Sequence, residues 1–273
     1  MAKMLNVGQV IDESWEQYSS SFIYFIKISA WMLITAVFQL AAVLVYPIES
    51  QVWDLRAILG FVLVILSNLI IAPAISIWVS NMLIKAIAEP TEKYANKFKE
   101  LSDFSWRMFF PHLWVIVLTS IAVILAGAIW LIPGAVLSIG ANNSSLKLLS
   151  MILITAGTII AILVMLKFSI SLFFSSFFVL LEKKKGVDAL KSSIALVRGR
   201  WWKTFWRLIV PFLLVYFAAY IMHVVIINVL GLAFAGLQIT SVRVIAAEFV
   251  TVIFLPITTI IGYRVFEGLK KNS

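Results

Sequence analysis

The sequence predicts an all-α integral membrane protein whose six transmembrane helices form three hairpins. Of the 273 residues, 62% are apolar and only 13% are charged, whereas a soluble domain is about 45–50% apolar and about 25% charged. Apolar runs of about 20 residues can cross a bilayer, and the chain contains six. They cover approximately residues 22–46, 57–84, 109–132, 148–181, 208–230 and 244–263. Because backbone amides cannot stay unpaired in lipid, each run is expected to be a helix.

The distribution of positive charge predicts the orientation. Seventeen Lys and Arg residues lie in the termini and in the loops after the second and fourth runs, against three in the other loops. Basic residues accumulate on the cytoplasmic side of membrane proteins, so we expect both termini and these two loops in the cytoplasm. The net charge of +9 therefore reflects topology, and no nucleic-acid partner is expected without a soluble basic module.

The first run is expected to be a transmembrane helix rather than a cleaved signal peptide, and two lysines inside the runs do not change this prediction. The first follows Glu13 and Glu16, whereas a secretory signal peptide has a basic segment before its apolar core. Lys27 and Lys167 interrupt the first and fourth runs near their predicted cytoplasmic ends, where their amines can extend to the headgroups. The segments outside the spans are too short for a soluble domain, so we expect residues 1–273 to form one polytopic membrane domain.

Several residues within the spans affect helix shape and packing. Pro73, Pro211 and Pro256 each remove a helical hydrogen bond and predict kinks, which can open a pathway, although proline is also common in membrane helices. The small residues around Gly127 and Gly157 predict places where two helices approach closely.

The two basic loops carry helical patterns of their own. Residues 91–108 and 187–207 space apolar and aromatic residues between polar ones, which predicts amphipathic helices in the membrane interface. The alternative is a solvated basic loop with a few buried aromatics. An aromatic junction recurs near Phe22, Trp106 and Trp201, so we expect an interfacial helix before each of the three hairpins.

Three parts of the chain follow the pattern of a known family. The matching positions of the second half are Glu182, Ala189, Leu190, Ser193, Leu196, Gly199, Trp201 and Trp202. The matching positions near the two ends are Ser14, Trp15, Glu16, Tyr18, Tyr263 and Arg264. In these residues the chain resembles the bacterial glycerophosphoryl diester phosphodiesterase membrane domain and the related YciC-like integral membrane proteins.

The resemblance implies a multi-pass protein of the bacterial inner membrane. Some members of that family carry the membrane domain fused to a catalytic phosphodiesterase barrel, for which this chain has no room, so we expect no enzymatic activity. The sequence also has no cysteine, no phosphate-binding loop and no nucleophile elbow. No cofactor and no metal site are therefore expected.

Two sets of residues are candidates for function. Ionisable residues inside spans are costly and often functional, and Glu248 and His223 are predicted at similar depth in the last two spans. Thr251 shares a helix face with Glu248, whereas Asn228 points away from His223 and is the weaker member of this polar site. The second set comprises basic and aromatic residues that would contact anionic lipid headgroups. Its members are Lys183, Lys184, Lys185, Arg198, Arg200, Trp201, Trp202 and Lys203.

These candidates lead to two hypotheses about function. The first is a non-enzymatic membrane protein with a structural, assembly or lipid-interacting role, whose partners are membrane lipids. The alternative is a small transporter or channel built around His223 and Glu248. The sequence leaves open a protein partner or a homo-oligomer in either case.

Overall fold

The computed structural model describes residues 6–45, 55–89, 98–140, 143–233 and 239–272, and every regular element in these ranges is a helix. The all-α prediction is confirmed. Six stretches are long and apolar enough to cross a membrane, as the sequence predicts. They are Phe22–Val45, Leu55–Ala88, Phe98–Ala128, Ser144–Glu182, Trp201–Leu232 and Ser241–Lys270.

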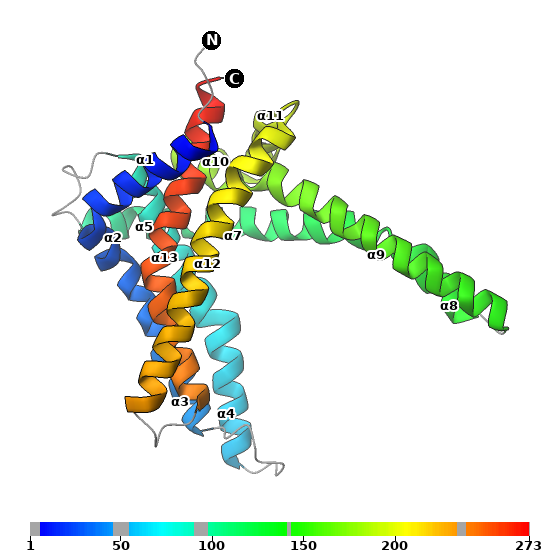
Figure 1. Ribbon diagram of the computed structural model, residues 1–273, viewed down its shortest axis with the longest axis horizontal. Coiled ribbons are helices and arrows are strands. Elements are labelled where there is room, and N and C mark those ends of the chain that lie inside the picture. The colour runs from blue at the N-terminus through cyan, green and yellow to red at the C-terminus, as the bar shows by residue number, and fades with distance from the viewer. Residues whose placement is uncertain (1–5, 46–54, 90–97, 141–142, 234–238, 273) are drawn as a thin grey trace. The chain divides into compact units, whose positions relative to one another are not determined.

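The helices form two compact units (Figure 1). The first unit comprises Met1–Phe109 and Trp206–Asn272, and the second comprises Phe110–Phe205. Two long helices, α7 (Phe98–Ala128) and α12 (Trp201–Ala233), have residues in both units.

The first unit is organised around α13 (Ile239–Lys270). The other elements of this unit are α1 (Val7–Ser20), α2 (Phe22–Ser29), the 3₁₀ turn η1 (Ala30–Met32), α3 (Leu33–Val45), α4 (Leu55–Leu66), the π turn η2 (Ser67–Ile71) and α5 (Ala72–Ala88). Helix α13 packs against α1, α2, α3 and α5, as Figure 1 shows for the orange-to-red helix. Its residues Ala246, Ile260, Ile261 and Leu269 are almost completely buried. Because lipid is as apolar as these side chains, van der Waals packing rather than water exclusion holds the helices together.

A proline in α13 releases a carbonyl that α2 then binds. Pro256 has no backbone N–H, so the Val252 carbonyl four residues earlier has no helical donor. The Ser29 hydroxyl is buried and donates to this carbonyl at 2.7 Å. Its next acceptor, the Phe25 carbonyl of its own helix, is farther away at 3.0 Å. The proline therefore creates an attachment point for α2 on α13.

Helix α1 is attached to the same part of α13. The Tyr18 hydroxyl donates to the Ile253 carbonyl at 2.8 Å. Burial raises the pKa of Tyr18 from 10.0 to about 12, so this hydroxyl keeps its proton at physiological pH. Nearer the C-terminus, Arg264 pairs with Glu13 of α1 at 3.8 Å and with Glu267 at 3.6 Å. Tyr18 and Arg264, which carry the family resemblance, therefore hold helices together.

The second span changes geometry ahead of Pro73. The π turn η2 separates α4 from α5, and Pro73 lies at the start of α5. A π turn widens the helix by one residue and is a common way to accommodate an interrupted hydrogen-bond ladder.

The C-terminal half of the second span, helix α5, is bound to α7. Buried Asn81 donates to the Ser105 carbonyl at 3.2 Å, and the Ser105 hydroxyl donates to the Trp78 carbonyl at 2.6 Å.

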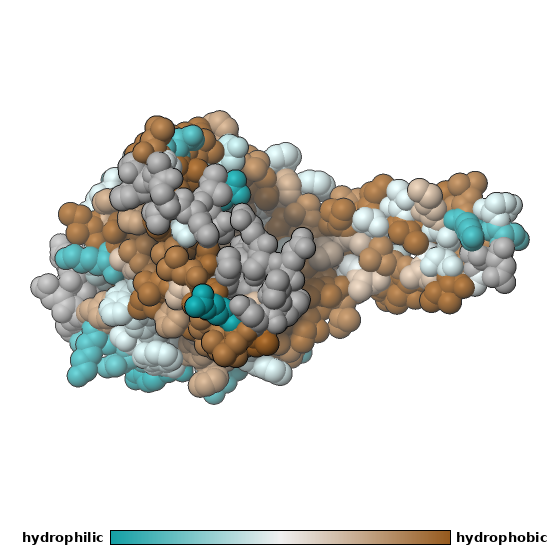
Figure 2. All heavy atoms as spheres, turned by 90° about the horizontal axis from the view of Figure 1, so that it is seen from below, coloured by the Kyte–Doolittle hydropathy of each residue, from teal (hydrophilic) through white to brown (hydrophobic). Residues whose placement is uncertain are grey.

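The second unit contains residues 110–128 of α7 together with α8 (Ile132–Gly140), α9 (Ser144–Leu172), α10 (Ser175–Glu182) and α11 (Gly186–Val197). Helices α8 and α9 lie side by side, and Figure 2 shows that apolar residues cover most of their visible surface. Exposed side chains such as Ile139, Leu148, Met151 and Ile162 contribute to this surface. Such a surface is suited to contact with lipid chains.

Glycines allow the close contact between α9 and the segment formed by α7 and α8. A Cβ atom on Gly134 would lie 2.7 Å from the Ile154 backbone nitrogen, and one on Gly157 would overlap the Trp130 carbonyl oxygen. A Cβ atom on Gly127 would lie 2.6 Å from the Met165 sulfur. The prediction of close approach at Gly127 and Gly157 is therefore confirmed.

Four details differ from the sequence predictions. Residues 98–108 are the beginning of α7 rather than a separate interfacial helix, because nothing interrupts the helical ladder before the third span. The segment 187–207 divides at Gly199, whose φ of 76° ends α11 and lets α12 begin at Trp201. The fourth run contains a break between α9 and α10, and α8 occupies part of a predicted loop. The arrangement as three hairpins and the N-in/C-in orientation stay predictions.

We expect Ser29→Ala to lower the free energy of unfolding by about 1–2 kcal/mol, because it leaves the Val252 carbonyl buried without its donor. In a Pro256→Ala background the new backbone N–H can bind that carbonyl, so Ser29→Ala should cost about 1 kcal/mol less. Unfolding in mixed micelles, followed by circular dichroism, measures all four proteins. Equal costs in both backgrounds would disprove the assignment of the Ser29 hydroxyl to the proline-released carbonyl.

We expect Gly157→Ala to destabilise the protein by about 1–3 kcal/mol, because the added methyl group would push Trp130 away from α9. Gly140→Ala is the matched control in the same pair of helices, since a Cβ atom there meets nothing within 4 Å. The same unfolding measurement in micelles compares the two variants. If both variants were as stable as the parent protein, the close contact would not require glycine.

Candidate lipid-binding surface

The break between α9 and α10 is held by one serine of α11. Ser193 is fully buried, accepts a hydrogen bond from the Phe174 amide at 3.2 Å and donates to the Ser171 carbonyl at 2.7 Å. The two backbone groups on either side of the break are thereby paired. Ala189 and Leu196 lie on the same buried face of α11, so the pattern that resembles the known family attaches α11 to the break.

Tight turns at both ends of α11 place basic residues on the surface. Lys183 ends α10 in the left-handed conformation, with φ of 57°, and Gly199 makes the turn into α12. Lys183, Lys185, Arg198 and Lys203 are exposed around these turns. Together with Trp202, whose side chain is 66% exposed, they form what we call the basic surface.

The tryptophans of this region differ in their contacts. Trp201 donates from Nε1 to the Lys167 carbonyl at 3.2 Å, and its ring stacks on Phe205 with a centroid distance of 5.3 Å. Trp202 packs edge-on against Trp201 at 4.8 Å. Trp201 therefore connects the start of α12 to α9, and Trp202 remains exposed beside the lysines, in the manner of interfacial tryptophans.

Lys184 differs from the other predicted lipid contacts because the protein itself binds its amine. The amine lies 3.1 Å from the Glu182 carboxylate, donates to the Ser192 hydroxyl at 3.0 Å and sits over the Phe178 ring. Arg200 is partly buried. The structure thus favours Lys183, Lys185, Arg198 and Lys203 as the cations available to lipid.

The structure does not join the predicted intramembrane polar residues into one cluster. Glu248 lies beside Thr35 of α3, whose hydroxyl donates to the Met32 carbonyl at 2.7 Å. Thr251 and Asn228 instead donate to carbonyls of their own helices, at Ala247 and Val224. Within the described ranges no hydrogen bond or ion pair joins His223 to Glu248, and a shared proton or cation site stays a prediction.

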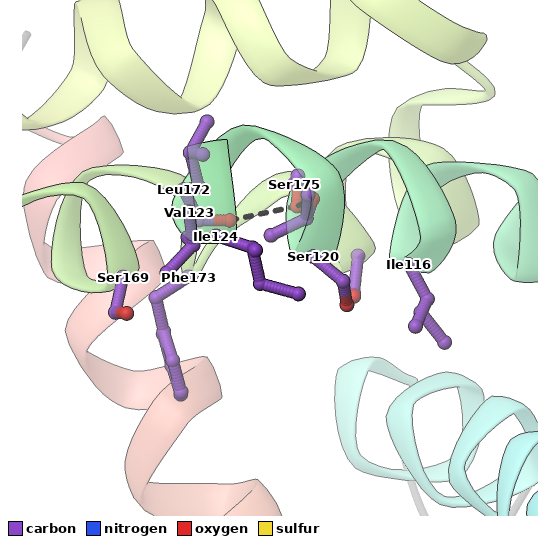
Figure 3. Close-up of a pocket in the computed structure, with 10 residues that line it drawn as sticks. Ile116, Ser120, Val123, Ile124, Ser169, Leu172, Phe173 and Ser175 are labelled. Carbon is purple, nitrogen blue, oxygen red and sulfur yellow. Dashed lines mark hydrogen bonds between the residues drawn. The ribbon is translucent and has the colours of Figure 1, made fainter. Parts of the chain in front are cut away.

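A cavity that the sequence analysis did not identify lies within the second unit. Its volume is about 480 Å³, and residues of α7, α9, α10 and the break between the last two line it. Five lining residues carry hydroxyl groups: Thr119, Ser120, Ser169, Ser175 and Ser176. Figure 3 shows Ser120, Ser169 and Ser175 among apolar side chains. The hydroxyl groups of Thr119 and Ser175 lie 3.3 Å apart. The only sign of this cavity in the sequence is the group of serines in the fourth run. Serine is common in membrane helices, so these residues do not stand out in the sequence.

We expect Ser193→Ala to lower the free energy of unfolding by about 2–3 kcal/mol, because it removes the two buried hydrogen bonds that hold the break between α9 and α10. Ser138→Ala is the control in the same unit, since Ser138 is exposed and donates only to the Ala135 carbonyl of its own helix. Unfolding in micelles measures both variants. Similar small effects would contradict a structural role for Ser193.

Comparison with known proteins identifies one family and no characterised relative. No curated protein and no solved structure matches the chain. A family model described as a domain of unknown function (DUF7847) matches residues 6–266. Since the match covers nearly the whole sequence, the chain belongs to the DUF7847 family, a family of unknown function.

Proposed function

We propose that this polytopic helical membrane protein is a non-enzymatic, lipid-interacting protein of the bacterial inner membrane, similar to the phosphodiesterase membrane-domain proteins. In this proposal both termini and the basic surface face the cytoplasm, as the distribution of Lys and Arg favours. The basic surface binds anionic phospholipid headgroups. In this proposal, binding to anionic headgroups orients the protein in the membrane. The structural or assembly role follows from that fixed orientation.

The observation that carries the proposal is the exposure of four cations around two turns that the fold holds in place. Lys183, Lys185, Arg198 and Lys203 are exposed beside Trp202. Ser193 and Trp201 attach the surrounding helices to α9. Each basic residue near an anionic membrane contributes roughly 1 kcal/mol to the attraction, and an exposed tryptophan is suited to the headgroup region.

The alternative of a transporter or channel has less support from the structure. It relies on His223 and Glu248 acting together, and within the described ranges they make no contact of hydrogen-bond or ion-pair type. Glu248 faces Thr35 instead. The basic surface needs no such pairing, because each of its cations can bind a headgroup independently.

We expect the triple variant Lys183→Gln, Lys185→Gln and Lys203→Gln to lose at least about tenfold of the preference for phosphatidylglycerol over phosphatidylcholine, since three favourable charges are removed. Native mass spectrometry of the full chain, titrated with each lipid, measures the preference.

The matched control removes the same number of charges elsewhere. Arg56, Lys147 and Arg243 are the three basic residues of the loops predicted outside, and all three are exposed. Their triple glutamine variant should keep its preference for phosphatidylglycerol. An equal loss in both triple variants would show a general charge effect, and no loss in the first would reject the basic surface.

A further inference from the structure

The cavity of the second unit contains two kinds of hydroxyl group. Thr119 and Ser175 lie 3.3 Å apart, and Ser175 also donates to the Leu172 carbonyl at 2.7 Å. The hydroxyl groups of Ser120, Ser169 and Ser176 form no hydrogen bond with any residue that the structure describes. Three hydroxyl groups therefore open into one cavity with their donor and acceptor capacity unused.

Other hydroxyl groups of α9, the helix of Ser169, bind the backbone of their own helix. Thr155, Thr158 and Ser171 of α9 each donate to a carbonyl four residues earlier, at distances of 2.7–2.8 Å. This backbone bond is the usual solution for a hydroxyl within a helix. The Ser120 and Ser169 side chains are exposed and Ser176 is partly buried, so the three hydroxyls are accessible to a ligand with hydrogen-bonding groups.

The walls of the cavity specify the chemistry of that ligand. None of the ten lining residues is charged, and the remaining five are Ile116, Val123, Ile124, Leu172 and Phe173. An anionic or cationic group would have no counter-charge from these residues. Hydroxyl and ester groups, in contrast, can exchange hydrogen bonds with serines while an alkyl chain contacts the apolar wall.

The position of the cavity along α9 also suits a lipid. Ser169 is two residues from Lys167, whose carbonyl binds the Trp201 indole. Lysine and tryptophan mark the interface between headgroups and hydrocarbon. The cavity volume of about 480 Å³ is within the range of small-molecule sites, about 300–1,000 Å³, and is sufficient for a glycerol group with its first ester bonds.

We propose that this cavity binds the uncharged glycerol group of a diacylglycerol, through Ser120, Ser169 and Ser176. The acyl chains leave the cavity along the apolar wall and continue into the bilayer. This site is separate in chemistry from the basic surface, because it selects a neutral lipid by hydrogen bonds, and either proposal can hold without the other.

The test uses the full chain in phosphatidylcholine nanodiscs and a diacylglycerol that carries a photoactivatable group near the first ester. We expect crosslinks within residues 116–124 and 169–176, and competition by unlabelled diacylglycerol but not by phosphatidylglycerol. Crosslinks elsewhere, or equal competition by phosphatidylglycerol, would overturn the proposal.

Variants distinguish the contribution of the cavity hydroxyls to binding from a general effect on the fold. Ser120→Ala, Ser169→Ala and Ser176→Ala together should weaken diacylglycerol binding about tenfold or more, since each lost hydrogen bond costs a factor of several. The control combines Ser138→Ala, Thr155→Val and Thr158→Val, which remove hydroxyls already bound to their own helices, and it should bind as the parent does. Ser120→Phe, which fills the cavity, should also abolish crosslinking. Unchanged binding in the triple alanine variant would reject the assigned hydroxyls.

Discussion

Every backbone group that a helix break releases inside a membrane needs a new partner, and hydroxyl side chains supply the partners at the critical positions of this protein. Ser29 binds the carbonyl that Pro256 leaves without a donor. Ser193 binds both sides of the break between α9 and α10, and Ser105 attaches α7 to α5. Ser29 and Ser193 bind groups that a proline or a helix break leaves without a helical partner. In all three cases the hydroxyl belongs to a different helix from the carbonyl, so the hydrogen bond joins two elements.

The same requirement explains why proline and glycine are useful in this fold. Pro256 weakens α13 locally but provides the acceptor that fixes α2, while Tyr18 fixes α1 one residue further along. Gly134 and Gly157 let backbones approach where lipid offers no hydrophobic driving force and contact area must come from close packing. Breaks and small residues that would weaken a soluble helix are thus the means of assembly within each unit.

The two proposed lipid sites depend on this scaffold in different ways. The basic surface needs the turns at Lys183 and Gly199, which present charged side chains around α11. The cavity needs the break that Ser193 holds, because Leu172, Phe173 and Ser175 line it. One buried serine therefore supports a surface that suits anionic headgroups and a cavity that suits a neutral glycerol group.

Apolar length and composition were sufficient to predict the class and the six spans, since burying about 20 apolar residues in lipid outweighs any local preference. The close approach at Gly127 and Gly157 was also predictable, because absence of a side chain is a property of the residue itself. The helix break after Leu172, the short helix α8, the neighbour of Glu248 and the cavity hydroxyls were decided only by the tertiary structure. Those features depend on which distant donor meets which carbonyl, and a single sequence does not encode that pairing in any local pattern.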